Sequence, residues 1–188
     1  ITRPEQIISS LQQAIQVMLD PADCGPACIS LSQDVQGEKY DYPEEFFKER
    51  IHAIIRAKPD DFQIKESAEL IKKSKQPIII SGGGVFYSDA TSELSAFAIK
   101  HNIPVTQTVM GYSTMKKDHS HYLGVIGGLG GKAANNFSKE TDMAIAIGTK
   151  LADFTTGSWT NFENPDFKLV SINTARFDAN KHMSQAIV

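Results

Sequence analysis

A run of three glycines is the first feature of this sequence that could bind a ligand. It consists of Gly82, Gly83 and Gly84 and directly follows the apolar residues 77–81. Glycine tolerates positive φ and lets a phosphate approach the N–H groups at the start of a helix. Tyr87 stands where a G-x-G-x-x-G motif would have its last glycine. A nucleotide-phosphate site and a tight packing turn therefore both remain open.

A second glycine cluster offers a larger backbone surface. Five of the eight residues 124–131 are glycine, and Gly127, Gly128 and Gly130 lie at its centre. A segment this rich in glycine, leading into a predicted helix, indicates a cradle for a ligand or for a neighbouring domain, although turns alone need glycine too. Lys150, just after Gly148, could offer a point charge to a phosphate or simply be solvated.

Other residue types that could do chemistry lack partners at the required spacing. Asp118, His119 and His121 lie together, but no third ligand at metal-site spacing accompanies them. Cys24 and Cys28 have no second Cys/His pair and read as the reduced thiols of a cytoplasmic protein. The G-x-S-x-G elbow and the G-x-x-x-x-G-K-[ST] loop are both absent from the sequence. We therefore predict no catalytic residue and no metal site in this chain.

Composition narrows the class of protein. The 188 residues are 41% hydrophobic, which is enough for a real core, and carry a net charge of −3 spread along the chain. Such a chain has no basic face for nucleic acid and no polybasic patch for a membrane. No apolar run approaches the roughly 18 residues that a membrane span needs. Because the sequence begins at Ile1 and ends in an apolar run, we expect both ends to be boundaries within a longer protein.

The glycine clusters depend for their position on alternating strands and helices after residue 62. Apolar runs predict buried strands at residues 77–81, 104–108, 142–148, 167–173 and 186–188. Periodic apolar residues predict helices at residues 62–75, 89–101 and 131–138, the second capped by Asp89, and residues 110–131 read mostly as a long loop. Short apolar strands separated by helices predict an α/β fold with a doubly wound parallel sheet.

The first third of the chain is organised differently. Residues 5–19 predict an amphipathic helix, and residues 27–32 predict a short buried strand. The polar segment that follows carries scattered aromatic residues such as Tyr40 and Phe46, and it reads as a connector whose aromatic side chains lie against a domain surface.

The ordered motifs resemble one enzyme superfamily. I-T-R-P-E-Q at residues 1–6 and G-P-A-C-I-S-L-S-Q-D-V at residues 25–35 resemble the end of the pyrimidine-binding domain of thiamine-diphosphate-dependent enzymes. Q-P-I-I-I-S-G-G-G-V at residues 76–85 and D-M-A-I-A-I-G-T-K at residues 142–150 resemble their Rossmann-like central domain. The resemblance implies a remnant of the pyrimidine-binding domain at 1–37, a connector at 38–61 and a central α/β domain at 62–188, truncated at its C-terminus.

Within this superfamily, two stretches resemble the hydrolases that open the ring of a trihydroxycyclohexane-1,2-dione in myo-inositol catabolism. They are L-S-Q-D-V-Q-G at residues 31–37 and S-I-N-T-A-R-F-D at residues 171–178. The resemblance implies that the intact enzyme is a homo-oligomer, a dimer or tetramer, that uses thiamine diphosphate and Mg²⁺. The carbanion of thiamine would attack a carbonyl, and Mg²⁺ would hold the diphosphate. The glutamate and the metal–diphosphate motif of the family belong to its other domains, so this chain alone should be inactive.

The resemblance also leaves an alternative, an acetolactate-synthase-like enzyme whose middle domain binds FAD or ADP. Its nucleotide-binding positions would be Gly82, Gly83, Gly84, Gly127, Gly128, Gly130, Lys150 and Asn173. Lys150 stands where a nucleotide-binding relative often has Arg, and Asn173 where many relatives carry Asp. Lysine is a weaker bidentate phosphate partner than arginine, so these two departures favour an empty, vestigial site.

Overall fold

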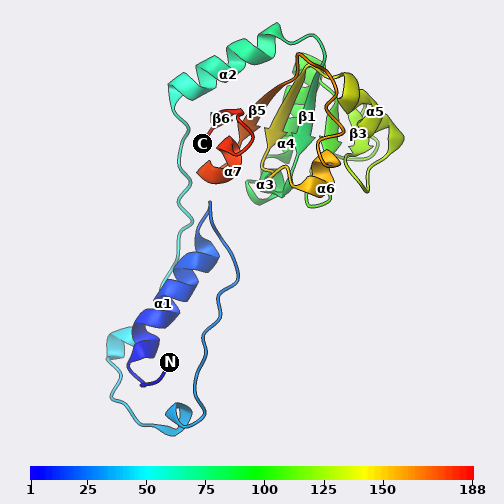
Figure 1. Ribbon diagram of the computed structural model, residues 1–188. Helices are drawn as coiled ribbons and strands as arrows, with labels where there is room; N and C mark the ends of the chain where they lie inside the picture. The colour runs from blue at the N-terminus through cyan, green and yellow to red at the C-terminus, as the bar shows by residue number, and fades with distance from the viewer. The chain divides into compact units, whose positions relative to one another are not determined.

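The computed structural model describes residues 1–188 and divides them into two compact units, Ile1–Arg56 and Ala57–Val188 (Figure 1). None of the helices combines the length and apolar character needed to cross a bilayer.

The first unit contains one long helix and two short 3-10 helices. They are α1 (Gln6–Leu19), η1 (Val35–Gly37) and η2 (Glu44–Phe47). Helix α1 confirms the predicted helix. Its first residue, Gln6, accepts hydrogen bonds at Oε1 from the backbone N–H groups of Thr2, at 2.8 Å, and Arg3, at 3.2 Å. This side chain therefore satisfies two backbone donors of the segment that precedes the helix.

The prediction of a strand at residues 27–32 is wrong. The segment is extended but belongs to no sheet, and it lies beside the start of the chain. The amino group of Ile1 donates to the Ser30 carbonyl at 2.6 Å, and the N–H of Ser32 donates to the Ile1 carbonyl at 3.5 Å. A β-strand needs a neighbouring strand for its N–H and C=O groups, and the first unit contains no strand.

Aromatic residues of the connector pack on one another in the first unit. The Tyr42 ring lies 5.0 Å from that of Tyr40, 5.5 Å from that of Phe46 and 6.1 Å from that of Phe47. The Tyr42 hydroxyl donates to the Pro4 carbonyl at 3.2 Å. This aromatic cluster therefore ties the segment around η2 to the residues that precede α1.

The second unit is built on a six-stranded sheet in which all strands run parallel, in the order β3-β2-β1-β4-β5-β6. The strands are β1 (Pro77–Ser81), β2 (Val105–Gln107), β3 (Tyr122–Val125), β4 (Met143–Ile147), β5 (Lys168–Ile172) and β6 (Gln185–Ile187). The helices are α2 (Asp61–Lys73), α3 (Gly83–Tyr87), α4 (Thr91–His101), α5 (Lys132–Glu140), α6 (Asp153–Thr156) and α7 (Arg176–Asn180). The strand order reverses between β1 and β4, so this is the predicted doubly wound α/β fold with its switch point there.

The core lies in two layers, one on each face of the sheet. Side chains alternate along β1, so that Ile79 packs on one face while Ile78 and Ile80 pack on the other. The Ile79 layer includes Leu94 and Ala98 of α4, and Leu70 of α2 packs against it. The opposite layer includes Ala134 of α5 and the partly buried Phe137. Both faces of β1 are therefore apolar, as its sequence predicted.

The sequence missed four short elements of the second unit. Helices α3, α6 and α7 have only four or five residues, too few to show a helical period. Strand β3 lies inside the predicted loop 110–131, at the edge of the sheet, and contains Gly124 with φ 101°. A half-buried edge strand that contains glycine does not stand out from a loop in the sequence.

The predicted N-cap of α4 is also wrong. Helix α4 begins at Thr91 and its capping position is Ala90. Asp89 has φ 54°, and its N–H donates to the Phe86 carbonyl at 3.0 Å, so it ends the preceding helix α3. Aspartate tolerates this left-handed conformation better than most residues. Asp89 therefore lies at the end of α3, a helix that the sequence did not predict, and does not cap α4.

A carboxylate stabilises the amino edge of the sheet, where the strands begin. The Asp142 side chain, just before β4, accepts hydrogen bonds from the Ser74 hydroxyl, from the Lys75 N–H at 2.7 Å and from the Gln76 N–H at 3.0 Å. Burial raises the pKa of Asp142, but these hydrogen bonds outweigh it and hold the pKa below its ordinary value of 3.8. The residues between α2 and β1 are therefore held to β4 by an ionised group.

Replacing this carboxylate should destabilise the fold in a pH-dependent way. Because the folded-state pKa is the lower one, the stabilisation is complete above pH 3.8 and is lost as the pH falls through the folded-state value. We expect Asp142→Asn to lower the free energy of unfolding at pH 7 by about 2 kcal/mol, and the difference from wild type to shrink below about pH 4.

Urea unfolding followed by circular dichroism at pH 7, 5 and 3 measures this difference. Glu66→Gln is the control, because Glu66 is exposed on α2 and makes no hydrogen bond or ion pair. A difference between wild type and Asp142→Asn that stays constant over this range would contradict the proposed role of the charge.

Candidate functional site

The candidate site lies at the switch point, where the ends of β1 and β4 meet in direct backbone contact. The N–H of Gly82 donates to the Ile147 carbonyl at 2.8 Å, and that of Gly84 to the Gly148 carbonyl at 2.9 Å. A Cβ atom added to Gly84 would lie 2.6 Å from the Gly148 Cα. Gly148 itself has φ 60°. The glycines at these strand ends therefore let two backbones approach more closely than any side chain would allow.

Gly83 faces another loop at the same edge. A Cβ added there would lie 3.0 Å from the carbonyl oxygen of Met110, which follows β2. The run of three glycines thus brings the ends of β1, β2 and β4 together, and the short helix α3 starts from this junction.

The second glycine cluster forms a loop that is hydrogen-bonded within the protein. The Gly127 N–H donates to Asn135 Oδ1 at 2.9 Å, and the Asn135 amide donates back to the Gly127 carbonyl at 3.0 Å. The N–H groups of Gly128 and Gly130 donate to the carbonyls of Phe154 and Gly127, both at 2.8 Å. A Cβ at Gly127, whose φ is 97°, would lie 2.8 Å from the Thr155 Cα. Protein acceptors therefore already occupy the N–H groups expected to form a ligand cradle.

Lys150 and Asn173 both take part in contacts between the loops after β4 and β5. The Lys150 ammonium lies 3.9 Å from a carboxylate oxygen of Asp178 and is largely exposed. The Asn173 amide donates to the Thr149 carbonyl at 3.1 Å, and its Oδ1 accepts from the N–H of Ala175 at 3.0 Å. The Asn173 side chain therefore needs both a donor and an acceptor, which an aspartate could not supply.

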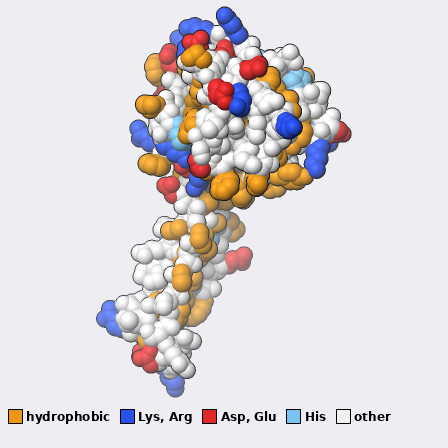
Figure 2. All heavy atoms as spheres, turned by 45° about the vertical axis from the view of Figure 1, so that its right-hand side comes forward, with side chains coloured by type: hydrophobic (Ala, Val, Ile, Leu, Met, Phe, Trp, Pro, Cys, Tyr) orange, Lys and Arg blue, Asp and Glu red, His pale blue; other side chains and the backbone are white.

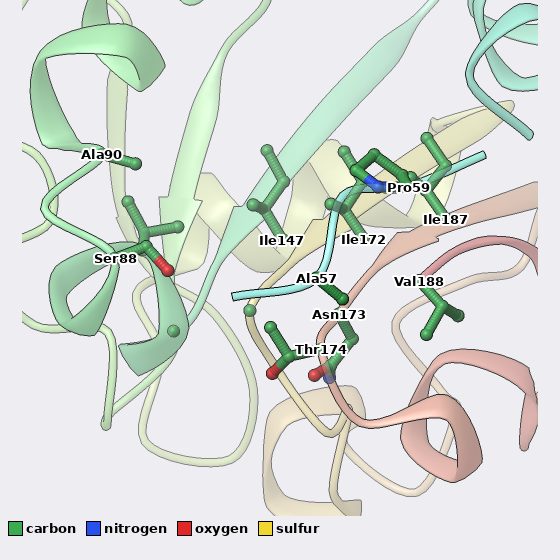
Figure 3. Close-up of a pocket in the computed structure, with 13 residues that line it drawn as sticks. Ala57, Pro59, Ser88, Ala90, Ile147, Ile172, Asn173, Thr174, Ile187 and Val188 are labelled. Carbon is green, nitrogen blue, oxygen red and sulfur yellow. The ribbon is translucent and has the colours of Figure 1, made fainter. Parts of the chain in front are cut away.

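A cavity of about 320 Å³ opens beside these residues at the carboxyl ends of β4, β5 and β6 (Figure 3). In Figure 3, Ile147, Ile172 and Ile187 lie along three neighbouring strands, with Asn173 and Thr174 at the end of one of them. The complete lining is Ala57, Pro59, Gly84, Val85, Ser88, Ala90, Ile147, Gly148, Ile172, Asn173, Thr174, Ile187 and Val188. The cavity is thus mostly apolar, with a few polar groups, as small-molecule pockets usually are.

Only two of the eight nucleotide-binding positions inferred from the sequence, Gly84 and Asn173, line this cavity. Gly82 and Gly83 lie next to it in the chain, while the second glycine cluster and Lys150 lie outside its lining. The sequence did not single out Ile147, Ile172 and Ile187, although each is the last residue of a strand. Their shared position at the ends of predicted strands could have identified them as cavity residues, because ligands of such sheets bind beyond the carboxyl ends of the strands.

Pro59 and Ala57 were also missed, since they belong to the segment before α2 that read as a connector. Their contribution to the lining depends on where the chain enters the second unit. Nothing local in the sequence marks this path. The cavity is therefore partly closed by the segment that leads into its own domain.

The histidines do not assemble a catalytic or metal site. The backbone N–H of His121 donates to His119 Nδ1 at 3.1 Å, so a neutral His119 ring carries its hydrogen on Nε2. That Nε2–H group then donates a hydrogen bond to Ser95 Oγ, 3.0 Å away. His119 is therefore placed to donate to Ser95 and not to activate it as a base. Burial lowers the pKa of His182, which outweighs the opposing effect of its hydrogen bond to the Leu151 carbonyl. No three His, Cys, Asp or Glu side chains come close enough together to hold a metal ion.

Comparison with known proteins points to one enzyme family. Residues 64–188 match the family model described as "Thiamine pyrophosphate enzyme, central domain". The chain is 44% identical over 188 residues to a 3D-(3,5/4)-trihydroxycyclohexane-1,2-dione hydrolase of Clostridium perfringens, and 47% identical over 181 residues to the hydrolase of that name from Bacillus subtilis. These alignments cover 100% and 96% of the chain but only 29% and 28% of the two relatives.

A solved structure supports the fold. The chain resembles an X-ray structure from Mycobacterium smegmatis assigned to the thiamin diphosphate-dependent enzymes, with a TM-score of 0.67 and 20% sequence identity. The match covers 92% of this chain and 32% of that one. At this identity the likeness speaks for the fold alone, and it agrees with the doubly wound sheet described above.

Changing Asn173 to the aspartate that the sequence comparison suggested should weaken the junction of the β4 and β5 loops. Asn173→Asp removes the amide donor and places a carboxylate against the Thr149 carbonyl. We expect it to lower the free energy of unfolding by about 1–2 kcal/mol at pH 7. Urea unfolding measures the loss. Asn164→Asp is the comparison variant, because its amide also donates to a backbone carbonyl, that of Glu140, but at the other edge of the sheet. An Asn173→Asp variant as stable as wild type would contradict the bridging role of Asn173.

Proposed function

The chain belongs to the thiamine pyrophosphate enzyme family, and from this we propose that it is the central part of a hydrolase that opens the ring of a trihydroxycyclohexane-1,2-dione. The observation that carries the proposal is the 44–47% identity to hydrolases of that name over at least 96% of the chain. The chain spans less than a third of the length of these relatives, so the activity belongs to the whole protein and not to these residues alone.

We assign the chain's segments within that enzyme as the motifs suggested. Residues 1–37 are the end of the pyrimidine-binding domain, residues 38–61 are the connector and residues 62–188 are the central domain. The intact protein then has further domains, works as a homo-oligomer in the cytoplasm and takes part in the breakdown of myo-inositol. A named family match over residues 64–188 supports the third of these segments.

Thiamine diphosphate and Mg²⁺ are the expected cofactors of the intact enzyme, where thiamine supplies a carbanion for attack on a carbonyl. The donor set of this chain does not fit the metal, because no three suitable side chains converge. We therefore assign no residue of this chain to the binding of thiamine diphosphate or Mg²⁺.

We further propose that the nucleotide site of the alternative, acetolactate-synthase-like reading is vestigial. Three observations support this. The N–H groups of Gly127, Gly128 and Gly130 already have protein acceptors. The Asn173 amide is bonded on both sides. Pro59 of the chain itself helps to line the crevice. The named relatives are also hydrolases and not acetolactate synthases.

Turnover by the full-length polypeptide tests the proposed activity. With thiamine diphosphate and Mg²⁺ present, it should open the ring of the trihydroxycyclohexane-1,2-dione, measured by loss of the dione on chromatography. The same reaction without thiamine diphosphate is the control. The 188-residue chain should show no turnover under either condition, and ring opening by this chain alone would contradict the assignment of the chemistry to other domains.

Nucleotide binding can be tested on the 188-residue chain by calorimetry with ADP and by flavin fluorescence with FAD. We expect no saturable binding of either ligand below about 100 µM. Micromolar binding would overturn the vestigial-site proposal and favour the flavin- or ADP-binding alternative.

A further inference from the structure

A second cavity of the second unit lies between helix α4 and the loop that joins β2 to β3. We call it the α4 cleft. Its volume is about 610 Å³, which is within the range of small-molecule sites. One wall is a single face of α4, and the other is formed by residues 113–116 and His119 of the loop. No residue lines both the α4 cleft and the apolar cavity of Figure 3, so the two are separate.

Two histidines of the loop hold the walls of the α4 cleft at a fixed separation. His119 Nε2 is hydrogen-bonded to Ser95 Oγ of α4 at 3.0 Å, and His121 Nε2 to Asn102 Oδ1 at the end of the helix, also at 3.0 Å. The buried Thr114 hydroxyl accepts a hydrogen bond of 2.7 Å from the last residue of β1, which anchors the start of the loop. The cleft is therefore preformed, and a ligand would lose little affinity to the ordering of its walls.

The polar side chains of the cleft offer hydrogen-bond donors that the protein does not use. Five of the ten lining residues are serine or threonine. Because Ser95 Oγ accepts from His119, its own hydroxyl hydrogen stays available. The hydroxyls of Thr91, Ser92 and Ser113 make no hydrogen bond within the protein. These groups suit a ligand that carries several oxygen acceptors.

Lys116 gives the cleft a positive charge. It is exposed and forms no ion pair. The acidic residues of the two wall segments, Glu93 and Asp118, are not among the lining residues. Figure 2 shows positive and negative side chains scattered over the visible face of the larger unit, without a large basic patch. The charge of the cleft therefore comes from one lysine and suits a ligand with one anionic group.

The remaining lining residues are apolar. They are Ala96, Ile99 and Met115, of which Met115 is buried. An inorganic anion would fill only a small part of the cleft and would gain nothing from this apolar side. A carbon skeleton with hydroxyl groups would contact both kinds of wall, since its C–H groups can face Ile99 and Met115 while its hydroxyls face the serines.

We propose that the α4 cleft binds a small polyhydroxylated anion, namely a sugar or open-chain polyol that carries one carboxylate or one phosphate. Lys116 pairs with the anionic group, because an ammonium and an anionic oxygen form a charge-assisted hydrogen bond. Ser95 and the other free hydroxyls bond to the hydroxyl groups of the ligand. The residues that carry this site belong to the chain itself, so its existence does not depend on the reaction of the intact enzyme.

The proposed function supplies one molecule of this class. Hydrolytic opening of a ring bond at a ketone leaves a carboxylate, and the three hydroxyl groups of a trihydroxycyclohexane-1,2-dione stay on the opened chain. We therefore expect the reaction product to bind in the α4 cleft. This identification of the ligand, unlike the site, rests on the proposed function.

Titration of the isotope-labelled 188-residue chain, followed by NMR, tests the site. D-glucuronate and glucose 6-phosphate are the anionic probes, and glucose is the neutral control. We expect at least one anion to shift the signals of Ser95, Lys116 and the His119 ring with a Kd of about 0.1–1 mM, and glucose to bind at least about tenfold more weakly. The anion that binds more tightly identifies the group, carboxylate or phosphate, that the cleft prefers.

Three results of this titration would overturn the proposal. The first is the absence of saturable shifts with either anion up to about 10 mM. The second is binding of glucose as tight as that of the anions, because the charge would then play no part. The third is binding of inorganic phosphate as tight as that of glucose 6-phosphate, because the hydroxyl groups would then contribute nothing.

Substitutions locate the binding. Lys116→Gln should weaken the binding of the anion about tenfold, and Ser95→Ala about threefold. Ala96→Phe should abolish it by filling the cleft. Lys117→Gln is the matched control and should change the Kd less than about twofold, because Lys117 lies over the Tyr112 ring and outside the lining. A loss in Lys117→Gln equal to that in Lys116→Gln would show that the anion binds elsewhere.

The site and the proposed function fail separately. Full-length protein that binds the anions in the cleft but does not open the ring would keep the site and remove the product as its ligand. Full-length protein that opens the ring while its Lys116→Gln variant binds the anions as tightly as wild type would overturn the site and leave the activity.

Discussion

The contact between the turn after β1 and the end of β4 is the constraint on which the carboxyl edge depends, that is, the arrangement of the loops that follow the carboxyl ends of the strands. Gly82 and Gly84 donate their N–H groups to the end of β4, and Gly148 meets Gly84 at a distance that leaves no room for a Cβ. At the switch point of a doubly wound sheet, adjacent connections leave in opposite directions and normally open a crevice. Here the backbones close part of that crevice, and what remains is the mostly apolar cavity over β4, β5 and β6.

This constraint explains why glycine patterns predict poorly what a loop binds. The glycines of both clusters could have served a phosphate or a close backbone contact, since either needs a residue without a side chain. Which one applies depends on where the N–H groups point, and that is decided by residues far away in the sequence. Asn135 accepts from Gly127, and the Phe154 carbonyl accepts from Gly128. Neither partner can be identified from the glycine spacing itself.

The regular parts of the fold were readable from the sequence for a related reason. Strands β1, β4 and β5 are buried on both faces and therefore appear as mostly apolar runs, while α1, α2 and α4 are long enough to show a helical period. The failures are elements whose existence depends on neighbours. Residues 27–32 are apolar but have no strand to pair with. Strand β3 forms at an exposed edge because β2 is there to receive it. The path of Pro59 over the sheet has the same long-range cause.

The amino and carboxyl ends of the strands are stabilised by different interactions. At the amino edge, Asp142 and its three hydrogen bonds hold the connection between α2 and β1, and the surface around them is polar. At the carboxyl edge, glycine contacts draw the loops together and leave one large apolar side chain exposed beyond each of five strands. A phosphate-bearing ligand at this edge would need free donors and charges, and here the N–H groups of Gly127, Gly128 and Gly130 are bonded within the protein. A surface that is apolar and poor in free donors is better suited to packing against protein than to holding a nucleotide phosphate.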